Sequence, residues 1–93
     1  MFVHLSIHSP KPEYEPELIE SMHRFGAAVE GAPGLRHAFT LKDEISGRLV
    51  GLMVWDSREQ RDAVIERSRI AVEHDDFDLW EQHEPEGFLL DEV

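Results

Sequence analysis

The order of hydrophobic and polar residues predicts that the first half of the chain forms a strand, a helix and a hairpin. Residues 2–8 alternate between two sets of side chains, which is typical of a half-buried strand. Residues 16–30 repeat apolar side chains at three- and four-residue steps, which indicates a helix with one buried stripe. Residues 35–42 and 48–55 are then predicted to be two strands joined by a short polar turn.

The second half of the chain is predicted to add one helix and one strand. Ser57 and Gln60 are spaced as in a capping box, so a helix is expected to begin there and to run to about residue 74. Residues 75–87 are acidic and irregular, and residues 88–93 are predicted to be the last strand. This element order implies an α+β fold in which one four-stranded sheet carries both helices on the same side.

The predicted third strand is apolar on both of its faces. One face carries Leu49, Met53 and Trp55, and the opposite face carries Val50, Leu52 and Val54. A strand of this kind is buried on both sides. Because two helices on one side can cover only that side, the other side is expected to pack against a second copy of the chain. The sequence therefore predicts a homodimer formed through sheet faces.

Length and charge limit the classes of function. The chain has 93 residues, which fits one domain spanning residues 1–93, and a net charge of −11. Such an acidic protein would be repelled by nucleic acids and by anionic membranes, so neither is expected as a partner. It has no Cys, which excludes thiol chemistry. No signal peptide or membrane-spanning segment is recognised, and a cytoplasmic location is expected.

The predicted second helix contains two polar residues that are candidates for a site. At about 100° per residue, Arg67 and His74 fall on the same face as Ala63, Ile70 and Ala71. In one interpretation, Arg67 extends to solvent and His74 interacts with the C-terminal end of the helix. In the other, both are polar anchors in a mostly apolar pocket.

Trp55 and Gly51 are candidates for a ligand cavity at the end of the third strand. A large aromatic residue such as Trp55 is usually part of a core or an interface, but it can also form a wall on which a ligand stacks. Gly51 lies four residues earlier on the same face, and a glycine inside a strand often marks a close approach of a ligand or of backbone.

The histidines give only a weak indication of metal binding. His4 and His8 share one face of the first strand, and His74 or His83 could complete a ligand set for a metal or for haem. Six histidines in this chain produce many chance pairs, and no metal-binding motif or phosphate-binding loop is present. No metal is therefore assigned.

Two short motifs resemble the antibiotic biosynthesis monooxygenase superfamily. The first is Pro33-Gly34-Leu35 after the first helix, and the second is Val54-Trp55-Asp56-Ser57 before the second helix. The resemblance covers essentially the whole chain in element order. It implies a ferredoxin-like βαββαβ fold with an antiparallel sheet, assembled as a dimeric α+β barrel. It also implies a small cavity between the sheet and the helices of each monomer.

The resemblance implies two known reactions, and the residues of both are incomplete here. Members that oxidise phenols or quinols with oxygen have a Trp that matches Trp55, an Asn at the position of Gly51 and a Tyr at the position of Arg61. Members that degrade haem have a helix Trp, which falls at about Val64, and a His near His74. They also need an Asn on the first strand, and this chain has no Asn.

The leading hypothesis is a cofactor-independent, monooxygenase-like enzyme that acts on an aromatic or quinol-type molecule. Arg67 or Arg61 would hold the substrate anion, and His74 would accept its proton. The residues expected to line the cavity are Trp55, Gly51, Met53 and Phe25. No cofactor is expected. The alternatives are a non-catalytic ligand-binding or stress-response dimer with the same cavity, a role in assembly, and haem binding.

Overall fold

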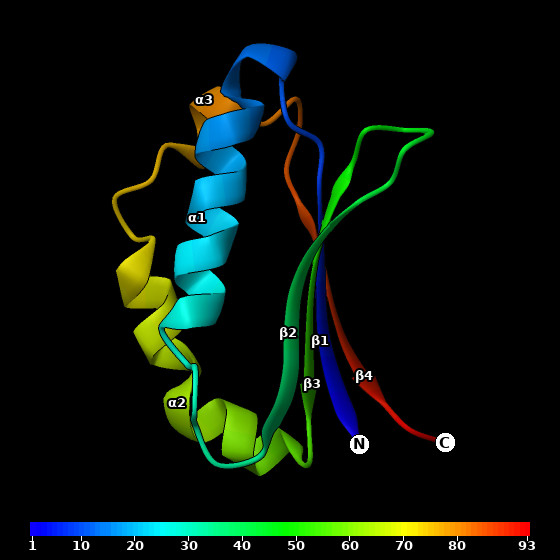
Figure 1. Ribbon diagram of the computed structural model, residues 1–93, viewed down its shortest axis with the longest axis vertical. Helices are drawn as coiled ribbons and strands as arrows, with labels where there is room; N and C mark the ends of the chain where they lie inside the picture. The colour runs from blue at the N-terminus through cyan, green and yellow to red at the C-terminus, as the bar shows by residue number, and fades with distance from the viewer.

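The protein consists of a sheet covered by helices on one side, as the computed structural model of residues 1–93 shows (Figure 1). The strands are β1 (Phe2–His8), β2 (Leu35–Lys42), β3 (Leu49–Trp55) and β4 (Glu86–Asp91). All neighbouring strands are antiparallel, in the order β2-β3-β1-β4. The predicted ferredoxin-like α+β fold is confirmed.

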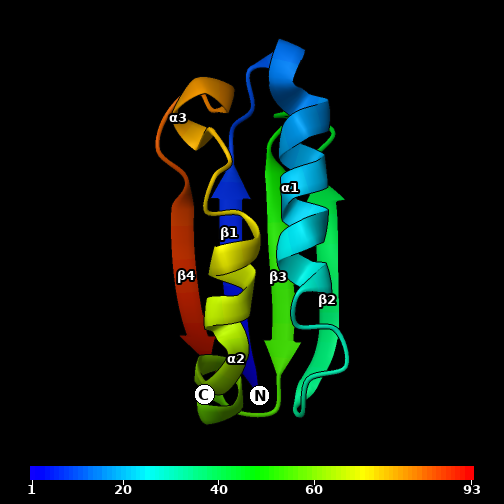
Figure 2. The same ribbon diagram turned by 90° about the vertical axis from the view of Figure 1, so that its left-hand side faces the viewer.

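The two long helices lie next to each other over the same face of the sheet (Figure 2). They are α1 (Glu15–Ala27), preceded by the short 3₁₀ helix η1 (Pro12–Tyr14), and α2 (Arg58–Ala71). Pro16 lies in the first turn of α1, where its missing N–H is not needed. Ser57 is the N-cap of α2 as predicted, because its hydroxyl accepts a hydrogen bond from the Gln60 N–H. The Gln60 side chain accepts from the same hydroxyl, so only the N-cap half of the capping box is formed.

The acidic segment after α2 is more ordered than its sequence indicates. It contains the short helix α3 (Phe77–Trp80), which the hydrophobic pattern did not predict. Backbone hydrogen bonds of 2.8 Å then join the Lys11 N–H to the Trp80 carbonyl and the Gln82 N–H to the Ser9 carbonyl. The segment is thereby fixed against the end of β1, and β4 begins at Glu86, two residues earlier than predicted.

A bulge near the start of β2 changes which residues share a face. Leu35 pairs with Trp55, but the next pair is His37 with Val54, so one extra residue is inserted between them. Leu35 therefore packs against the core on the helix side, whereas His37 and Phe39 lie on the opposite face. Strict alternation along residues 35–42 would put Leu35 on the same face as His37 and Phe39, and the bulge reverses this for Leu35.

The main core lies between the sheet, the residues that follow α1 and the middle of α2. Trp55 is completely buried there, and it is surrounded by Phe2, Val29, Val64 and Ile65 among others. A second, smaller cluster is formed by Leu18, Met22 and Leu49 nearer the start of α1. These two clusters hold α1 and α2 against one sheet face.

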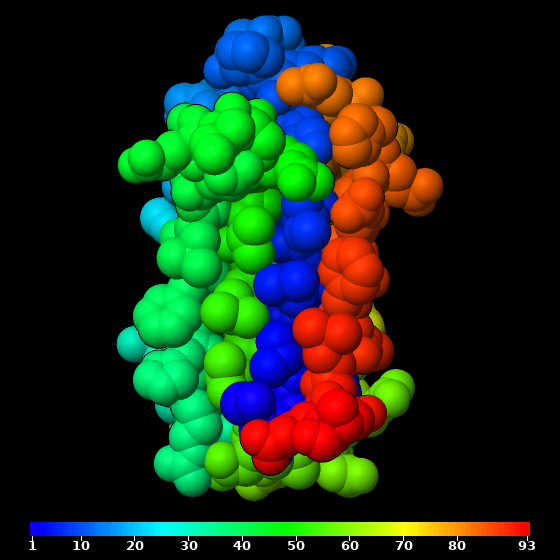
Figure 3. Space-filling model, turned by 90° about the vertical axis from the view of Figure 1, so that its right-hand side faces the viewer, coloured from blue at the N-terminus to red at the C-terminus, as the bar shows by residue number.

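The opposite face of the sheet has no helix over it (Figure 3). Its side chains are mostly apolar, and the β1 and β3 positions alternate with the core positions as predicted. Several of these apolar side chains are strongly exposed, including Phe39, Leu41, Phe88 and Leu90. No helix is long and apolar enough to cross a membrane.

We predict that Gly34→Ala destabilises the protein more than Gly47→Ala. Both glycines have positive φ values, 87° and 75°, so each alanine would cost about 1 kcal/mol for the left-handed backbone. A Cβ at Gly34 would also overlap the Gln60 side-chain amide, whereas a Cβ at Gly47 would meet nothing. Displacing the Gln60 amide would break its hydrogen bond with the Ser57 hydroxyl and add about 0.5 to 1 kcal/mol. Urea unfolding measures the difference, and equal losses would contradict it.

Candidate functional site

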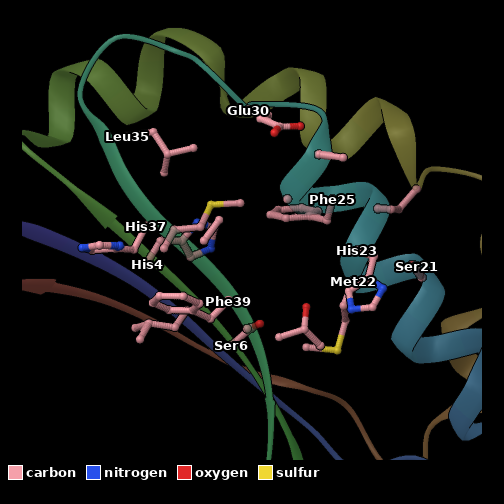
Figure 4. Close-up of a pocket in the computed structure, with 18 of the residues that line it drawn as sticks. His4, Ser6, Ser21, Met22, His23, Phe25, Glu30, Leu35, His37 and Phe39 are labelled. Carbon is pink, nitrogen blue, oxygen red and sulfur yellow. The ribbon is translucent and has the colours of Figure 1, made fainter.

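A cavity of about 810 Å³ lies between α1 and the sheet (Figure 4). Its walls come from β1, α1, β2 and β3, with small contributions from the segment after α2. The apolar part of the wall includes Met22, Phe25 and Met53, and the polar part includes His4 and Ser6. Its volume lies in the range of pockets that hold small organic ligands.

Small residues where α1 faces the sheet leave this space open. Gly26 on α1 lies opposite Ala38 on β2, and a Cβ on Gly26 would lie 3.8 Å from the Ala38 Cβ. Gly51 on β3 lets the Ser6 hydroxyl and the Met22 methyl come close to the strand, because a Cβ there would lie 2.7 Å from the Ser6 oxygen and 3.4 Å from Met22 Cε. The cavity therefore lies where small residues line the boundary between the layers, with the two core clusters on either side of it.

His4 contributes a neutral ring to the cavity wall. Burial, assisted by the positive charges of Arg61 and Arg69, lowers the pKa of His4 to about 4. Its ring lies edge-on to Phe25, with 6.0 Å between the ring centroids. Its Nδ1 atom is buried and has no hydrogen-bond partner. His4 is thus uncharged at neutral pH and has unused hydrogen-bonding capacity beside an aromatic side chain.

A chain of hydrogen bonds leads from the cavity to a buried carboxylate. The Ser6 hydroxyl lies 3.1 Å from Nε2 of His8, and Nδ1 of His8 lies 3.1 Å from Oε1 of Glu81. The Ser9 N–H also donates to Oε1, at 3.3 Å. Ser6 and His8 are both part of the cavity wall, and Glu81 is buried behind them.

A second polar cluster joins α1 to the turn after α2. The Ser21 hydroxyl donates to Asp75 at 2.5 Å, and the Arg24 guanidinium lies 2.9 Å from the same carboxylate oxygen. Burial opposes the ionisation of Asp75, but these hydrogen bonds and the charge of Arg24 outweigh it and lower the pKa of this carboxyl. Because all of its groups are paired, the cluster has a structural explanation that requires no ligand.

Three of the four predicted cavity residues are in the wall. Gly51, Met53 and Phe25 line the cavity, although Met53 is also part of the main core. Trp55 is not among the lining residues, because it is completely buried in the core. Of the two interpretations of Trp55, this position corresponds to the core residue and not to a cavity wall.

The structure does not bring Arg67 and His74 to the cavity. The buried face of α2 carries Arg61, Val64, Ile65 and Ser68, so the apolar face predicted from Ala63 and Ile70 was misplaced. Arg67 is exposed on the outer side of the helix. The His74 side chain is 94% exposed and lies next to Glu73. Neither residue is among those that line the cavity.

Arg61 lies close to the cavity without lining it. Its side chain is only 8% exposed, and one guanidinium nitrogen lies 2.8 Å from Asp62. Its Nε atom is buried without a partner. Its positive charge is near enough to His4 to lower the pKa of that histidine. Arg61 therefore affects the electrostatics of the site from outside the wall.

Sequence reasoning missed that the inner face of β1 supplies several polar groups of the site. The alternation of His4, Ser6 and His8 was visible, but the histidines were considered only as metal ligands. No group of three or more His, Asp or Glu side chains could hold a metal ion. Glu81 could not be assigned from the sequence, since it reaches His8 through a contact between residues 73 positions apart.

Comparisons of sequence and of structure give different amounts of information. No protein-family model matches the chain, and a search of curated proteins finds no match. Solved structures do match. Rv0793 from Mycobacterium tuberculosis aligns with a TM-score of 0.82 and 13% identity, over 99% of this chain and 94% of that one. A provisionally assigned antibiotic biosynthesis monooxygenase from Nitrosomonas europaea aligns with a TM-score of 0.73 and 16% identity, over 100% and 99%.

A third similar structure contains a bound ligand. It is a point mutant of MhuD with two manganese protoporphyrin IX molecules in each active site, and it aligns with a TM-score of 0.74 and 20% identity over 100% of this chain and 95% of that one. This chain has the antibiotic biosynthesis monooxygenase-like fold. Within that monooxygenase-like fold, identities this low describe the backbone arrangement and do not transfer catalytic residues.

We predict that His4 makes the protein less stable at acidic pH. The unfolded chain takes up a proton at His4 near pH 6.5, whereas the folded protein does so only near pH 4. Between these values the unfolded state binds more protons, so stability falls as the pH is lowered through this window. After allowance for partial solvent exposure, the loss should be about 1 to 2 kcal/mol.

Urea unfolding of the wild type and of His4→Phe, at pH 7 and at pH 4.5, measures this contribution. His4→Phe keeps an aromatic ring next to Phe25 and should show a smaller loss on acidification. His83→Phe, at an exposed histidine, should retain the full wild-type loss. If His4→Phe loses as much stability as the wild type, the group responsible is not His4.

Proposed function

We propose that the protein is a cofactor-independent, monooxygenase-like enzyme that oxidises a small aromatic or quinol-type molecule in the cavity between α1 and the sheet. The observation that carries this proposal is the neutral, unpartnered ring of His4 in a cavity of about 810 Å³. The size suits a substrate of one to a few rings. The likeness to a provisionally assigned antibiotic biosynthesis monooxygenase supports the reaction class.

The walls suit an aromatic substrate with a hydroxyl group. Met22, Phe25 and Met53 can contact the faces and edges of a ring through apolar and sulfur–aromatic contacts. The His4 ring can form a hydrogen bond with the hydroxyl, which orients the substrate. Apolar walls also limit water, which strengthens that hydrogen bond. Binding of this kind positions the substrate and does not require a metal ligand.

The proposed reaction is balanced with oxygen alone. A phenol with a free ring position and one O₂ molecule give a quinone and one water molecule. One oxygen atom forms the new ring carbonyl, and the other leaves as water with the hydroxyl proton and the ring hydrogen. His4 is a weak base in the empty cavity, but a phenolate beside it would favour the protonated ring. His4 would thus stabilise the anion that reacts with oxygen.

The test is oxygen consumption with a panel of phenols and hydroquinones, followed together with the absorbance of the quinone product. His4→Phe should lower turnover about 100-fold, the usual contribution of one acid–base group. Gly26→Leu should also lower turnover, because the new side chain would fill the cavity opposite Ala38. Glu20→Leu, at an exposed position on the same helix, is the matched control and should retain activity.

The same experiment separates catalysis from simple binding. A non-catalytic ligand-binding dimer would bind members of the panel, and Gly26→Leu would weaken that binding, but no oxygen would be consumed. Titration with a metalloporphyrin tests the haem alternative, which is favoured by the ligand of the MhuD mutant structure. Binding without oxygen consumption would contradict the proposed oxidation.

We also propose that the protein is a homodimer in which the uncovered sheet faces pack against each other. The support is the row of apolar side chains across all four strands, with no helix over them. Leu41 and Leu90 are 47% and 44% exposed on this face, which is unfavourable for a protein that remains a monomer. A second copy would offer the same apolar surface and bury both.

We predict that Leu41→Asp weakens self-association at least 10-fold, because it would bury a charge at the contact between the sheets. The matched control is Ile70→Asp, which introduces the same charge on α2 at a side chain that is 57% exposed on the other side of the molecule. Sedimentation velocity over a range of concentrations measures the dissociation constant. A wild type that sediments as a monomer at all concentrations would contradict the proposed dimer.

A further inference from the structure

The proposed oxidation of a phenol makes no use of the hydrogen-bonded chain of Ser6, His8 and Glu81. We propose that Ser6 is a nucleophile that accepts the acyl group of a small aryl ester in the cavity. His8 is its general base, and Glu81 is the positioning residue that orients His8. This activity is independent of the proposed oxidation, because it needs neither oxygen nor His4.

The charge of Glu81 decides which nitrogen of His8 faces Ser6 without a proton. An ionised carboxylate can only accept hydrogen bonds, so Nδ1 of His8, 3.1 Å from Oε1, carries the proton. In the neutral ring, Nε2 is then unprotonated and accepts the hydrogen bond of the Ser6 hydroxyl over 3.1 Å. This is the tautomer that a general base must have in order to remove the proton of a serine.

Glu81 is held in place by the backbone around it. Residues 80–82 are bonded to residues 9–11 by two backbone hydrogen bonds of 2.8 Å, and the Gln82 amide donates to the Pro10 carbonyl at 2.9 Å. The side chains of His8 and Glu81 are only 12% and 2% exposed. Because both partners are enclosed and anchored, the orientation of His8 costs little entropy to maintain.

The second oxygen of the Glu81 carboxylate, Oε2, is buried and makes no hydrogen bond within the chain. The side chain of His8 is therefore the only side-chain partner of this carboxylate, and a positive imidazolium at 3.1 Å would be attracted to it. An imidazolium forms whenever His8 takes the proton of Ser6. The arrangement therefore stabilises the charged state that nucleophilic attack creates.

Ser6 is flanked by two glycines that leave its hydroxyl accessible. In the sheet it pairs with Gly51 of β3 on one side and with Gly87 of β4 on the other. A Cβ on Gly51 would lie 2.7 Å from the Ser6 oxygen, so any side chain there would press on the nucleophile. A Cβ on Gly87 would meet nothing within 4 Å. An acyl group on Ser6 would therefore have space on the Gly87 side and would lie at the wall of the cavity.

The proposed step balances without any further reagent. The Ser6 oxygen attacks the ester carbonyl carbon while its proton moves to Nε2 of His8. The bond from the carbonyl carbon to the aryl oxygen breaks, and His8 returns the proton to the departing aryl oxide. The products are a phenol and acyl-Ser6, which water then hydrolyses to a carboxylic acid and free Ser6. Aryl esters are favoured because a phenol, with a pKa of about 10, leaves readily.

The probe for this site is p-nitrophenyl acetate with the intact protein. We expect release of p-nitrophenolate, and peptide mapping by mass spectrometry should place one acetyl group on Ser6. Ser6→Ala should abolish that acetylation, and His8→Gln should slow it about 100-fold. Ser46→Ala, in the exposed hairpin, should behave as the wild type. Circular dichroism melting shows whether each variant is folded.

The position of the acetyl group decides the result even if a variant does not fold. Acetylation of the wild type at lysines or at the N-terminus, with Ser6 unmodified, would overturn the proposal. Glu81→Gln separates a positioning role from a structural one. It should lower kcat about 10-fold or more and leave KM unchanged, because it alters the orientation of His8 and not the cavity. An unchanged kcat in a folded Glu81→Gln variant would remove Glu81 from the site.

Discussion

The arrangement of this protein depends on a sheet that is apolar on both faces and has helices for only one. The helices bury Trp55 and Phe2 on the inner face, in the larger of the two core clusters. The outer face keeps its apolar side chains, and no part of the same chain covers it. The fold therefore separates two tasks, because the inner face encloses a cavity while the outer face is left for association.

The inner face holds a cavity because its packing is interrupted at a few positions. Where Trp55 or Leu49 meets the helices, the layers are in full contact. Between them, the cavity is lined by small residues such as Gly51 and Gly26. A close-packed interior does not tolerate such a gap unless the layers are held apart on both sides. The two core clusters do this, so the cavity is part of the architecture and not a defect in it.

Strand β1 contributes polar groups to this cavity because every second residue of β1 faces the helices, and α1 and β2 contribute other polar groups. His4 and Ser6 enter the cavity directly, and His8 leads to a carboxylate that comes from the other end of the chain. The same strand thus offers two different chemical environments. His4 is isolated, desolvated and uncharged, whereas His8 is connected to Glu81. One cavity of this kind can provide a hydrogen-bonding group for a phenol and a nucleophile for an ester.

The sequence by itself determined the strands, the two long helices and their layers, because hydrophobic periodicity and capping are local properties. It also indicated the lining role of Gly51 and Phe25. It misassigned α2, whose buried face includes Arg61 and Ser68, because polar residues buried by tertiary contacts do not contribute to an apolar pattern.

Only the tertiary structure decided where the candidate chemistry lies. Trp55 is buried in the core, and His74 is exposed on the surface. The neighbours of each helix or strand determine which of its sides is covered, and its own residues do not. The bulge after Leu35 and the contact of Glu81 with His8 likewise depend on pairing between distant segments. Those pairings follow from how the whole chain buries its apolar surface, which no local stretch of sequence contains.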